Sequence, residues 1–407
     1  MNFISIAVYV LLLLSFVPGL KLAPRRGFNE DSMSLDAMTS LKGVLAIFVL
    51  CHHLSQKPAF QQTHTISFFE HIGFLFVGIF FLCSGYGLYK SYLKKPDYLK
   101  TFLKRRVLPI VIFYYVMIAV YAVYHLIQGS PFTPVEWALK LFGLVSINSQ
   151  CWYVIVIVIF YLAFYLIYKN EKTGKYGIPL FIVISLAFGI LFCIIGHFPW
   201  YASPKNWWVN PANFASIPWW KNPCALPFEG EWWVNSMFGF VAGLFIAQNE
   251  DKFIEWSSKK YWLKFAVTFV IFLVVSAIGF FCLFNISFWS EFAFDGKLGI
   301  PNKLICYTAQ CLQVIVTDVF VLLVMRKVYV RNRFYDFFGK RSLEVYLMQE
   351  LALFAWLYLI QKGDKPIFTS GNTNVILYMV VVTLTVLVSA IIYHWINVKL
   401  TRGLKKS

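Results

Sequence analysis

Two adjacent histidines, His52 and His53, lie in an otherwise apolar stretch that runs LKGVLAIFVLCHHL from Leu41 to Leu54. An imidazole is costly to hold inside a membrane and is usually retained there for a function. A neutral imidazole can take a proton from a hydroxyl or carry a transferred group. The alternative is a packed histidine that hydrogen bonds within the fold.

Lys42 precedes His53 by eleven residues. At about 100° per residue this spacing is three helical turns and about 20°, so both residues share one stripe, about 16 Å apart. The pattern predicts a helix with a cation near one membrane face and a base partway through.

The histidines and cysteines do not indicate a metal site. Adjacent helical residues point about 100° apart, which is poor geometry for joint metal ligation. Seven of the eight cysteines lie in apolar stretches, only Cys224 lies clearly in a loop, and no CxxC occurs. We therefore expect no metal, and cysteines that act as small buried apolar residues.

A second segment, FFLCSGYG from Phe80 to Gly87, carries Ser84, Gly85 and a second glycine. Small residues allow two helices to approach closely. They also leave room for a substrate chain against the backbone. The segment alone leaves both interpretations open.

A basic segment follows, with seven lysines and arginines in the seventeen positions from Lys90 to Arg106. Arg105 and Arg106 stand at the start of an apolar stretch, just before Pro109. Arginine binds phosphate in a bidentate manner, so the pair suits a diphosphate-bearing donor such as coenzyme A. The alternative is anchoring of a cytoplasmic loop by positive charge.

Long apolar runs separated by short charged loops occupy nearly the whole chain. The 407 residues are 59% hydrophobic and 19% aromatic, with a mean hydropathy of +0.66. This pattern predicts an all-α, polytopic transmembrane bundle of about 10–11 spans. Eleven spans are expected at approximately 3–20, 43–60, 67–89, 107–128, 151–168, 177–197, 233–248, 265–286, 304–325, 342–360 and 374–397.

The net charge of +17 follows the loops. Alternate loops, with Lys42, hold 28 of the 36 lysines and arginines, and the other loops hold 8. This asymmetry places the N-terminus outside and the C-terminus in the cytoplasm of a cell membrane, in contact with lipid and with no nucleic-acid partner. The first span lacks a basic leader and a cleavage site, so residues 1–34 are expected to be a retained extra helix with its cytoplasmic link, before a domain at 35–407.

The order of these segments resembles the acyltransferase 3 family of integral membrane acyltransferases, which acylate surface polysaccharides. The resemblance covers residues from about 35 to 397. It rests on the following features: Lys42 eleven positions before His53, the FFxxSG segment, Arg106 three before Pro109, Trp152 opening a span, Met237–Gly243, and Phe338–Leu347.

The resemblance implies transfer of an acyl group, acetyl from acetyl-CoA as co-substrate, to a hydroxyl of an extracytoplasmic sugar or polysaccharide. His53 aligns with the family's histidine, as general base or covalent acyl carrier, and His52 is an extra candidate. Lys42, Arg105, Arg106 and Ser84 would contact the donor.

The chain departs from the family at four positions. Lys42 replaces an arginine, Asp36 lies farther from it than usual, Leu103 stands three before Arg106, and Gln349 stands where a histidine is frequent.

The acceptor is expected near the tryptophans of the outside segment 198–232, with Trp207 and Trp208 as stacking platforms. An interfacial aromatic belt explains the same residues. Asp318, inside an apolar span, is a further substrate-binding candidate because intramembrane carboxylates commonly face a cavity.

Two other functions compete. Asp318, His53 and Glu350 inside the bilayer would also suit a proton-coupled transporter, although no two-fold repeat or pair of broken helices is evident. The departures at Lys42 and Gln349 would suit a catalytically inactive membrane sensor with the same fold.

Overall fold

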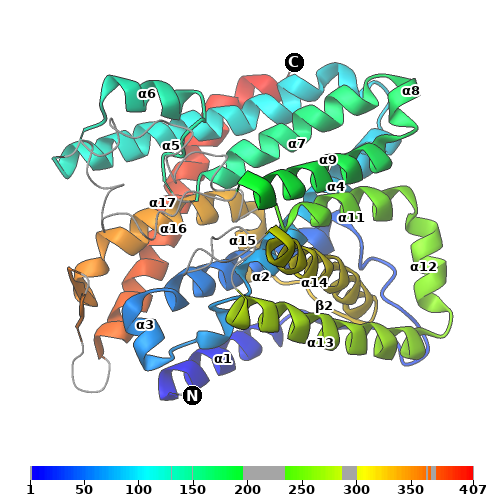
Figure 1. Cartoon of the computed structure of the whole chain (residues 1–407), viewed down its shortest axis with the longest axis horizontal. Coiled ribbons are helices and arrows are strands. Elements are labelled where there is room, and N and C mark those ends of the chain that lie inside the picture. The colour runs from blue at the N-terminus through cyan, green and yellow to red at the C-terminus, as the bar shows by residue number, and fades with distance from the viewer. Residues whose placement is uncertain are drawn as a thin grey trace.

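The fold is described from a computed structural model. It describes residues 2–129, 131–148, 150–195, 234–286, 300–363, 365–367 and 373–406. Helices dominate these residues, and the strands are confined to two short antiparallel pairs (Figure 1).

The first half of the chain contains α1 (Phe3–Phe16), β1 (Leu20–Leu22), α2 (Leu35–Ser55), α3 (Pro58–Thr63), η1 (Ser67–Phe69), α4 (Gly73–Lys94), η2 (Tyr98–Thr101), η3 (Leu103–Val107), α5 (Leu108–Ile127), α6 (Pro134–Leu141), α7 (Trp152–Tyr168), α8 (Glu171–Gly174) and α9 (Gly177–Ile195). The second half contains α11 (Met237–Gln248), α12 (Glu250–Ser258), α13 (Tyr261–Asn285), α14 (Ile300–Lys327), β2 (Val328–Val330), α15 (Arg333–Lys340), α16 (Ser342–Ala355), η7 (Leu357–Leu359), β3 (Gln361–Lys362), β4 (Lys365–Pro366) and α17 (Thr373–Lys406).

The predicted all-α transmembrane bundle is confirmed. Six helices are long and apolar enough to cross a membrane, and four shorter apolar helices coincide with other expected spans. The remaining expected span, 342–360, is the 14-residue α16 followed by the short turn η7. A helix of 14 residues covers only about 21 Å, so α16 is too short to cross a bilayer alone.

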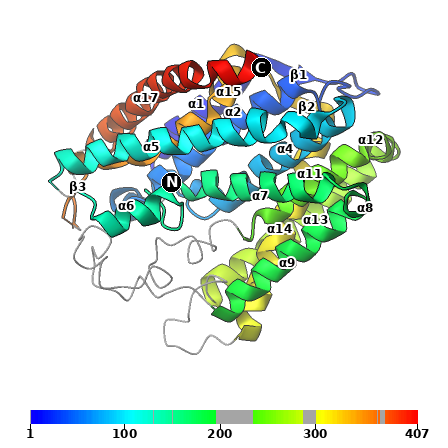
Figure 2. The same cartoon turned by 90° about the horizontal axis from the view of Figure 1, so that it is seen from above.

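Burial distinguishes central helices from peripheral ones. In α4, 72% of the membrane-spanning window is buried, whereas in α13 only 11% is buried. Figure 2 shows α13 and α14 beside α9 at one end of the molecule, with α17 at the other. The exposed apolar side chains of α13 thus form a surface suited to lipid.

Local sequence explains where α2 begins and ends. The side chain of Ser34 accepts a hydrogen bond from the backbone N–H of Ala37, and Asp36 lies in the positively polarised first turn. At the other end Pro58 cannot continue the helix and instead begins α3. This helix carries both Lys42 and His53.

Glycines bring neighbouring helices into backbone contact with α2 and α4. A Cβ atom at Gly43 would lie 1.9 Å from the carbonyl oxygen of Tyr335, so α2 and α15 cross closely. A Cβ atom at Gly85 would lie 2.3 Å from the carbonyl oxygen of Phe240, so α4 and α11 do the same. Close helix approach therefore explains Gly85 in the FFLCSGYG segment.

A short ribbon joins the N-terminal segment to the junction of α14 and α15. Strands β1 and β2 pair antiparallel, with Lys21 opposite Tyr329. Nearby, Asp36 forms an ion pair with Arg331. Both strands come from loops that the charge pattern assigns to the same membrane side, so the pairing agrees with the expected topology.

Candidate active site

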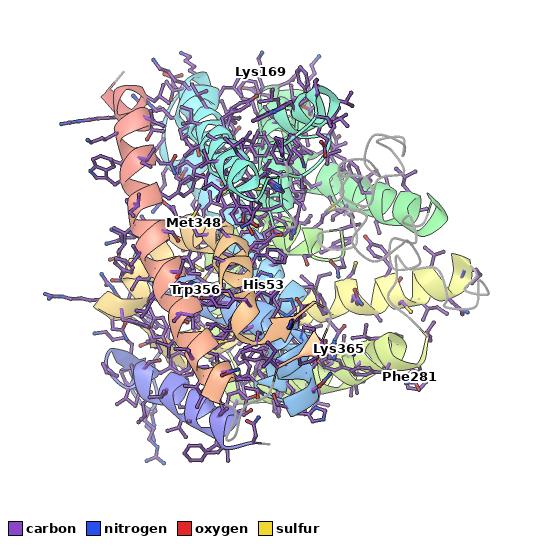
Figure 3. All side chains as sticks on the ribbon, turned by 90° about the vertical axis from the view of Figure 1, so that its left-hand side faces the viewer. His53, Lys169, Phe281, Met348, Trp356 and Lys365 are labelled. Atoms are coloured by element: carbon purple, nitrogen blue, oxygen red, sulfur yellow. The ribbon has the colours of Figure 1, made fainter. Side chains whose placement is uncertain are left out.

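His53 lies near the end of α2, inside the bundle (Figure 3). Its Nδ1 atom lies 2.7 Å from Oε1 of Gln349 on α16. The Nε2 atom of Gln349 donates to the carbonyl oxygen of Ala46 at 3.4 Å, which orients the amide. Oε1 must then accept, so Nδ1 of His53 carries the proton and Nε2 holds the free lone pair. The nitrogen able to act as a base is therefore Nε2.

A second amide and two charged side chains complete the surroundings of His53. The side-chain amide of Gln150 lies 3.2 Å from the same Nδ1 atom, and because that atom carries the proton, the amide must turn its oxygen toward it. Lys57, in the loop after α2, lies near both His53 and the Glu350 carboxyl group, and its ammonium stacks 5.0 Å from the ring centroid of Phe354. Burial lowers the pKa of Lys57, and the Glu350 carboxylate opposes that shift.

His52 contacts the backbone of neighbouring segments and helps to hold them together. Its Nδ1 atom lies 2.8 Å from the carbonyl oxygen of Phe69, and its ring packs against the start of α4, where a Cβ at Gly73 would lie 2.4 Å away. The two imidazole centroids are 5.2 Å apart. Of the two histidines, His53 has the polar surroundings of a reactive group.

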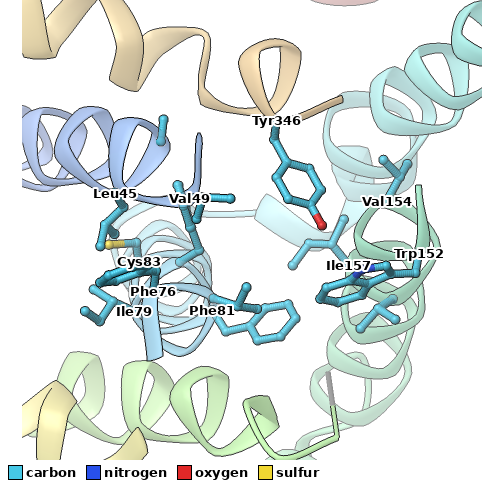
Figure 4. Close-up of a cluster of buried hydrophobic side chains, with 14 of the residues drawn as sticks. Leu45, Val49, Phe76, Ile79, Phe81, Cys83, Trp152, Val154, Ile157 and Tyr346 are labelled. Carbon is cyan, nitrogen blue, oxygen red and sulfur yellow. The ribbon is translucent and has the colours of Figure 1, made fainter. Parts of the chain in front are cut away.

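A narrow inner cavity of about 130 Å³ lies on the Lys42 side of His53. Helices α2, α4, α5, α7 and α16 line it, with Lys42, Val49, Val77, Phe80, Ser84, Ile110, Tyr153, Ile157, Tyr161, Ser342, Leu343 and Tyr346. Figure 4 shows Tyr346 pointing from α16 into the space between Val49 and Ile157. The Tyr346 ring is 6.1 Å from that of His53, so one wall of this cavity lies next to the histidine.

A larger outer cavity of about 410 Å³ lies beside the inner one. Lys42, Ser342 and Leu343 line both cavities. Two further polar features line the outer cavity: the Glu344 carboxylate 2.5 Å from His394 Nδ1, and the buried Asn397 amide, whose polar atoms make no hydrogen bond among the described residues. The outer cavity is thus the wider and more polar of the two, and the inner cavity is narrow and lined by Tyr153, Tyr161 and Tyr346.

The predicted donor residues occupy different places relative to these cavities. Lys42 lies where the cavities meet, and Ser84 lines the inner one as a hydrogen-bond neighbour of Tyr153 and Tyr161. Arg105 and Arg106 are exposed in the π-helical turn η3 and line neither cavity. Arg106 nevertheless stacks 5.9 Å from the Tyr98 ring centroid, close to Tyr161 of the inner cavity.

A half-buried, oriented histidine close to two cavities that a lysine lines suits the transfer of a chemical group. Comparison with known families identifies which kind of transfer. A family model described as an acyltransferase domain, acyltransferase 3, matches residues 35–394. The chain belongs to the acyltransferase 3 family. No curated protein and no solved structure matches it.

Family membership makes the protein a multi-pass membrane acyltransferase, and the structure shows how the chain's own residues stand at the family's positions. Gln349, at the position where the family frequently has histidine, is the residue that holds His53. Asp36 pairs with Arg331 and does not reach Lys42 by an ion pair among the described residues. Lys42 keeps the positive charge beside both cavities.

The other predicted acyltransferase site residues lie apart from these cavities or outside the description. Asp318 is buried on α14, near Cys83, and lines neither of the two cavities. Trp207 and Trp208 lie outside the described residues, as does the rest of segment 198–232. Within the described part of the chain, no three His, Cys, Asp or Glu residues are grouped as a metal site.

Sequence reasoning missed Gln150 and the Glu344–His394 pair as site residues and met Gln349 only as a departure from the family. Gln349 and Gln150 each lie in or beside an apolar stretch, and an isolated amide there is the signal that could have identified them.

Proposed function

We propose that this acyltransferase moves an acyl group, acetyl in the first instance, from cytoplasmic acyl-CoA to a hydroxyl of an extracytoplasmic sugar or polysaccharide. The observation that carries the proposal is the anchored imidazole of His53. Its Nδ1 atom is held by Gln349, its Nε2 atom is left as a base, and its ring lies beside Tyr346, which lines the inner cavity.

The two cavities support the choice of an acyl thioester as donor. Lys42 and Lys340 give the outer cavity positive charge, which suits the phosphates of coenzyme A. The narrow inner cavity has apolar and tyrosine walls, which suit a thin acyl-bearing arm. Arg105 and Arg106 would meet the donor's phosphates at the cytoplasmic entrance, and Ser84 would contact the arm.

In the reaction, Nε2 of His53 takes the proton of the acceptor hydroxyl as its oxygen attacks the thioester carbonyl carbon. The new C–O bond forms, the C–S bond breaks, and the thiolate leaves with the electron pair of that bond. The imidazolium then releases its proton. An alternative within the same proposal is that Nε2 attacks first and carries the acyl group to the hydroxyl.

The acceptor would approach from the side of His53 opposite to Lys42. Trp207 and Trp208 remain proposed stacking platforms for sugar rings, and Asp318 remains a proposed contributor to substrate binding. The membrane that we propose is the cell membrane, with the N-terminus outside and the C-terminus in the cytoplasm.

The test is acetyl-CoA turnover by purified protein in liposomes, wild type against His53→Ala. Turnover that disappears in the variant supports the proposal, whereas equal turnover in both proteins contradicts the role of His53. Binding of acetyl-CoA without transfer to any acceptor would favour the inactive sensor. Proton-coupled solute uptake without acetyl-CoA turnover would favour a transporter.

A further inference from the structure

Three buried polar side chains gather at the end of the site opposite to Lys42. Tyr121 on α5, Asn148 and Gln150 before α7 are 3%, 8% and 4% exposed. Gln150 contacts His53, and the Tyr121 hydroxyl lies beside Asn148 and the Glu350 carboxyl group. Of the three, Gln150 is the one that contacts the proposed base.

The orientation of Asn148 is fixed by its own backbone contacts. Its Oδ1 atom accepts hydrogen bonds from the backbone N–H groups of Gln150 at 2.9 Å and Cys151 at 2.7 Å. The amide cannot turn over without losing both bonds. Its Nδ2 atom is consequently a donor beside the Tyr121 hydroxyl, and among the described residues it makes no hydrogen bond of good geometry.

Gln150 and Tyr121 each have spare hydrogen-bonding capacity as well. One amide atom of Gln150 faces Nδ1 of His53, and the other makes no hydrogen bond among the described residues. Whichever way the amide is turned, one of its two polar atoms remains spare. The buried hydroxyl of Tyr121 lies within reach of the Asn148 side chain and the Leu351 backbone, but among the described residues it meets neither at good hydrogen-bond geometry.

Buried polar groups without partners are uncommon in native proteins because losing water without gaining a hydrogen bond costs free energy. Three such groups on neighbouring segments, one of them in contact with His53, indicate a ligand that supplies the missing partners. A hydroxyl group both donates and accepts, so neighbouring hydroxyls can satisfy an N–H donor, an amide group and a phenol together. An alkyl chain would leave all three without partners.

We infer that Tyr121, Asn148 and Gln150 form a subsite that holds the acceptor's hydroxyl groups beside His53 and selects a polyol head group over a monohydric alcohol. This inference rests on the proposed function, because it assigns the hydroxyl acceptor to that reaction.

The test compares two probes with the same alkyl chain, octyl glucoside and 1-octanol, both below micelle-forming concentrations. Binding to the protein in lipid nanodiscs is measured by equilibrium dialysis of radiolabelled probe, with empty nanodiscs subtracted. The main variant is Tyr121→Phe, which removes a hydroxyl that meets no partner at good geometry among the described residues and so leaves the melting temperature unchanged. Tyr168→Phe, a buried tyrosine at the opposite end of α7, is the matched control.

Wild type and Tyr168→Phe are expected to bind octyl glucoside more tightly than 1-octanol. Tyr121→Phe is expected to bind octyl glucoside about fivefold more weakly, the effect of one neutral hydrogen bond, with 1-octanol binding unchanged. Asn148→Asp keeps the oxygen that caps the backbone and replaces the donor by an acceptor, so it should weaken octyl glucoside binding in the same way.

The inference is overturned if wild type fails to bind octyl glucoside, if both probes bind equally, or if Tyr121→Phe binds octyl glucoside as wild type does. Transfer of radiolabelled acetyl from acetyl-CoA is measured on the same preparations. Selective binding without any transfer would contradict the proposed function and leave the subsite standing. Transfer without selective binding would contradict the subsite alone.

Discussion

The Nδ1 atom of His53 and the Oε1 atom of Gln349 lie 2.7 Å apart and join α2 to α16 close to the inner cavity. Gln349 performs for this imidazole the orienting role that a carboxylate performs in many catalytic histidine pairs. Being neutral, it fixes the proton on Nδ1 without adding a charge to a site that already contains Lys57 and Glu350.

Replacing Gln349 tests this orienting role. Gln349→Leu removes the acceptor for the Nδ1 proton, so we expect kcat to fall on the order of 10²-fold with little change in the KM for acetyl-CoA, because the base is misplaced while the donor cavities are intact. Gln349→Glu and Gln349→His each restore a hydrogen-bonding partner and should recover much of the rate. Steady-state kinetics in liposomes, with melting temperatures alongside, provide the measurement.

A merely structural Gln349 predicts another pattern. All three variants would then lose rate in proportion to their loss of thermal stability, and neither Glu nor His would rescue kcat selectively.

We expect His53 to contribute to catalysis and His52 to contribute to stability. His53→Ala removes the proposed base and should lower the transfer rate by about 10²–10⁴-fold. His52→Ala instead leaves the Phe69 carbonyl oxygen without its partner, which should cost about 1–3 kcal/mol of stability and leave most of the activity in the folded fraction. Activity per folded molecule, with folding followed by thermal unfolding, distinguishes them. The reverse ranking would move the chemistry to His52.

We expect Lys42 to contribute to binding of the acyl donor and not to binding of the acceptor. Because its side chain lines both cavities, Lys42→Met is expected to raise the KM for acetyl-CoA by about tenfold, consistent with the loss of one hydrogen bond to a charged group. Lys42→Arg, which introduces the family's residue, should retain binding. Lys175→Met serves as the control, because Lys175 is an exposed lysine directly after the C-terminal end of α8. A change in acceptor KM with donor KM unaltered would refute the assignment.

Periodicity and charge predicted the helices well because each is a local property of the chain. Their ends shifted where capping or turns intervened. The span expected at 43–60 corresponds to α2, which begins earlier, at Leu35, because Ser34 caps it, and ends earlier, at Ser55, before Pro58 begins α3. The span expected at 67–89 begins at Gly73 because Ser67–Phe69 forms a tight turn after Ile66, whose φ is 49°.

The site was harder to predict than the fold. Lys42 and His53 were found because they share one helix stripe. The hydrogen bond between His53 and Gln349 joins residues 296 positions apart, and the one to Gln150 spans 97 positions. Helix periodicity carries no information on which faces meet across a bundle, so these partners required the tertiary structure.

Asp318 provides a test in which stability and function should move in opposite directions. Its carboxyl group is 1% exposed, and neither oxygen makes a hydrogen bond among the described residues. Burying such a group costs free energy, so Asp318→Asn should raise the melting temperature. A carboxyl retained inside a membrane against that cost indicates a function, and we therefore expect the same variant to lower acyl transfer. Asp251→Asn, at an exposed carboxylate of α12, is the control. A stabilised variant with full transfer would show that Asp318 has no part in the reaction, and a destabilised one would show that the carboxylate holds the fold.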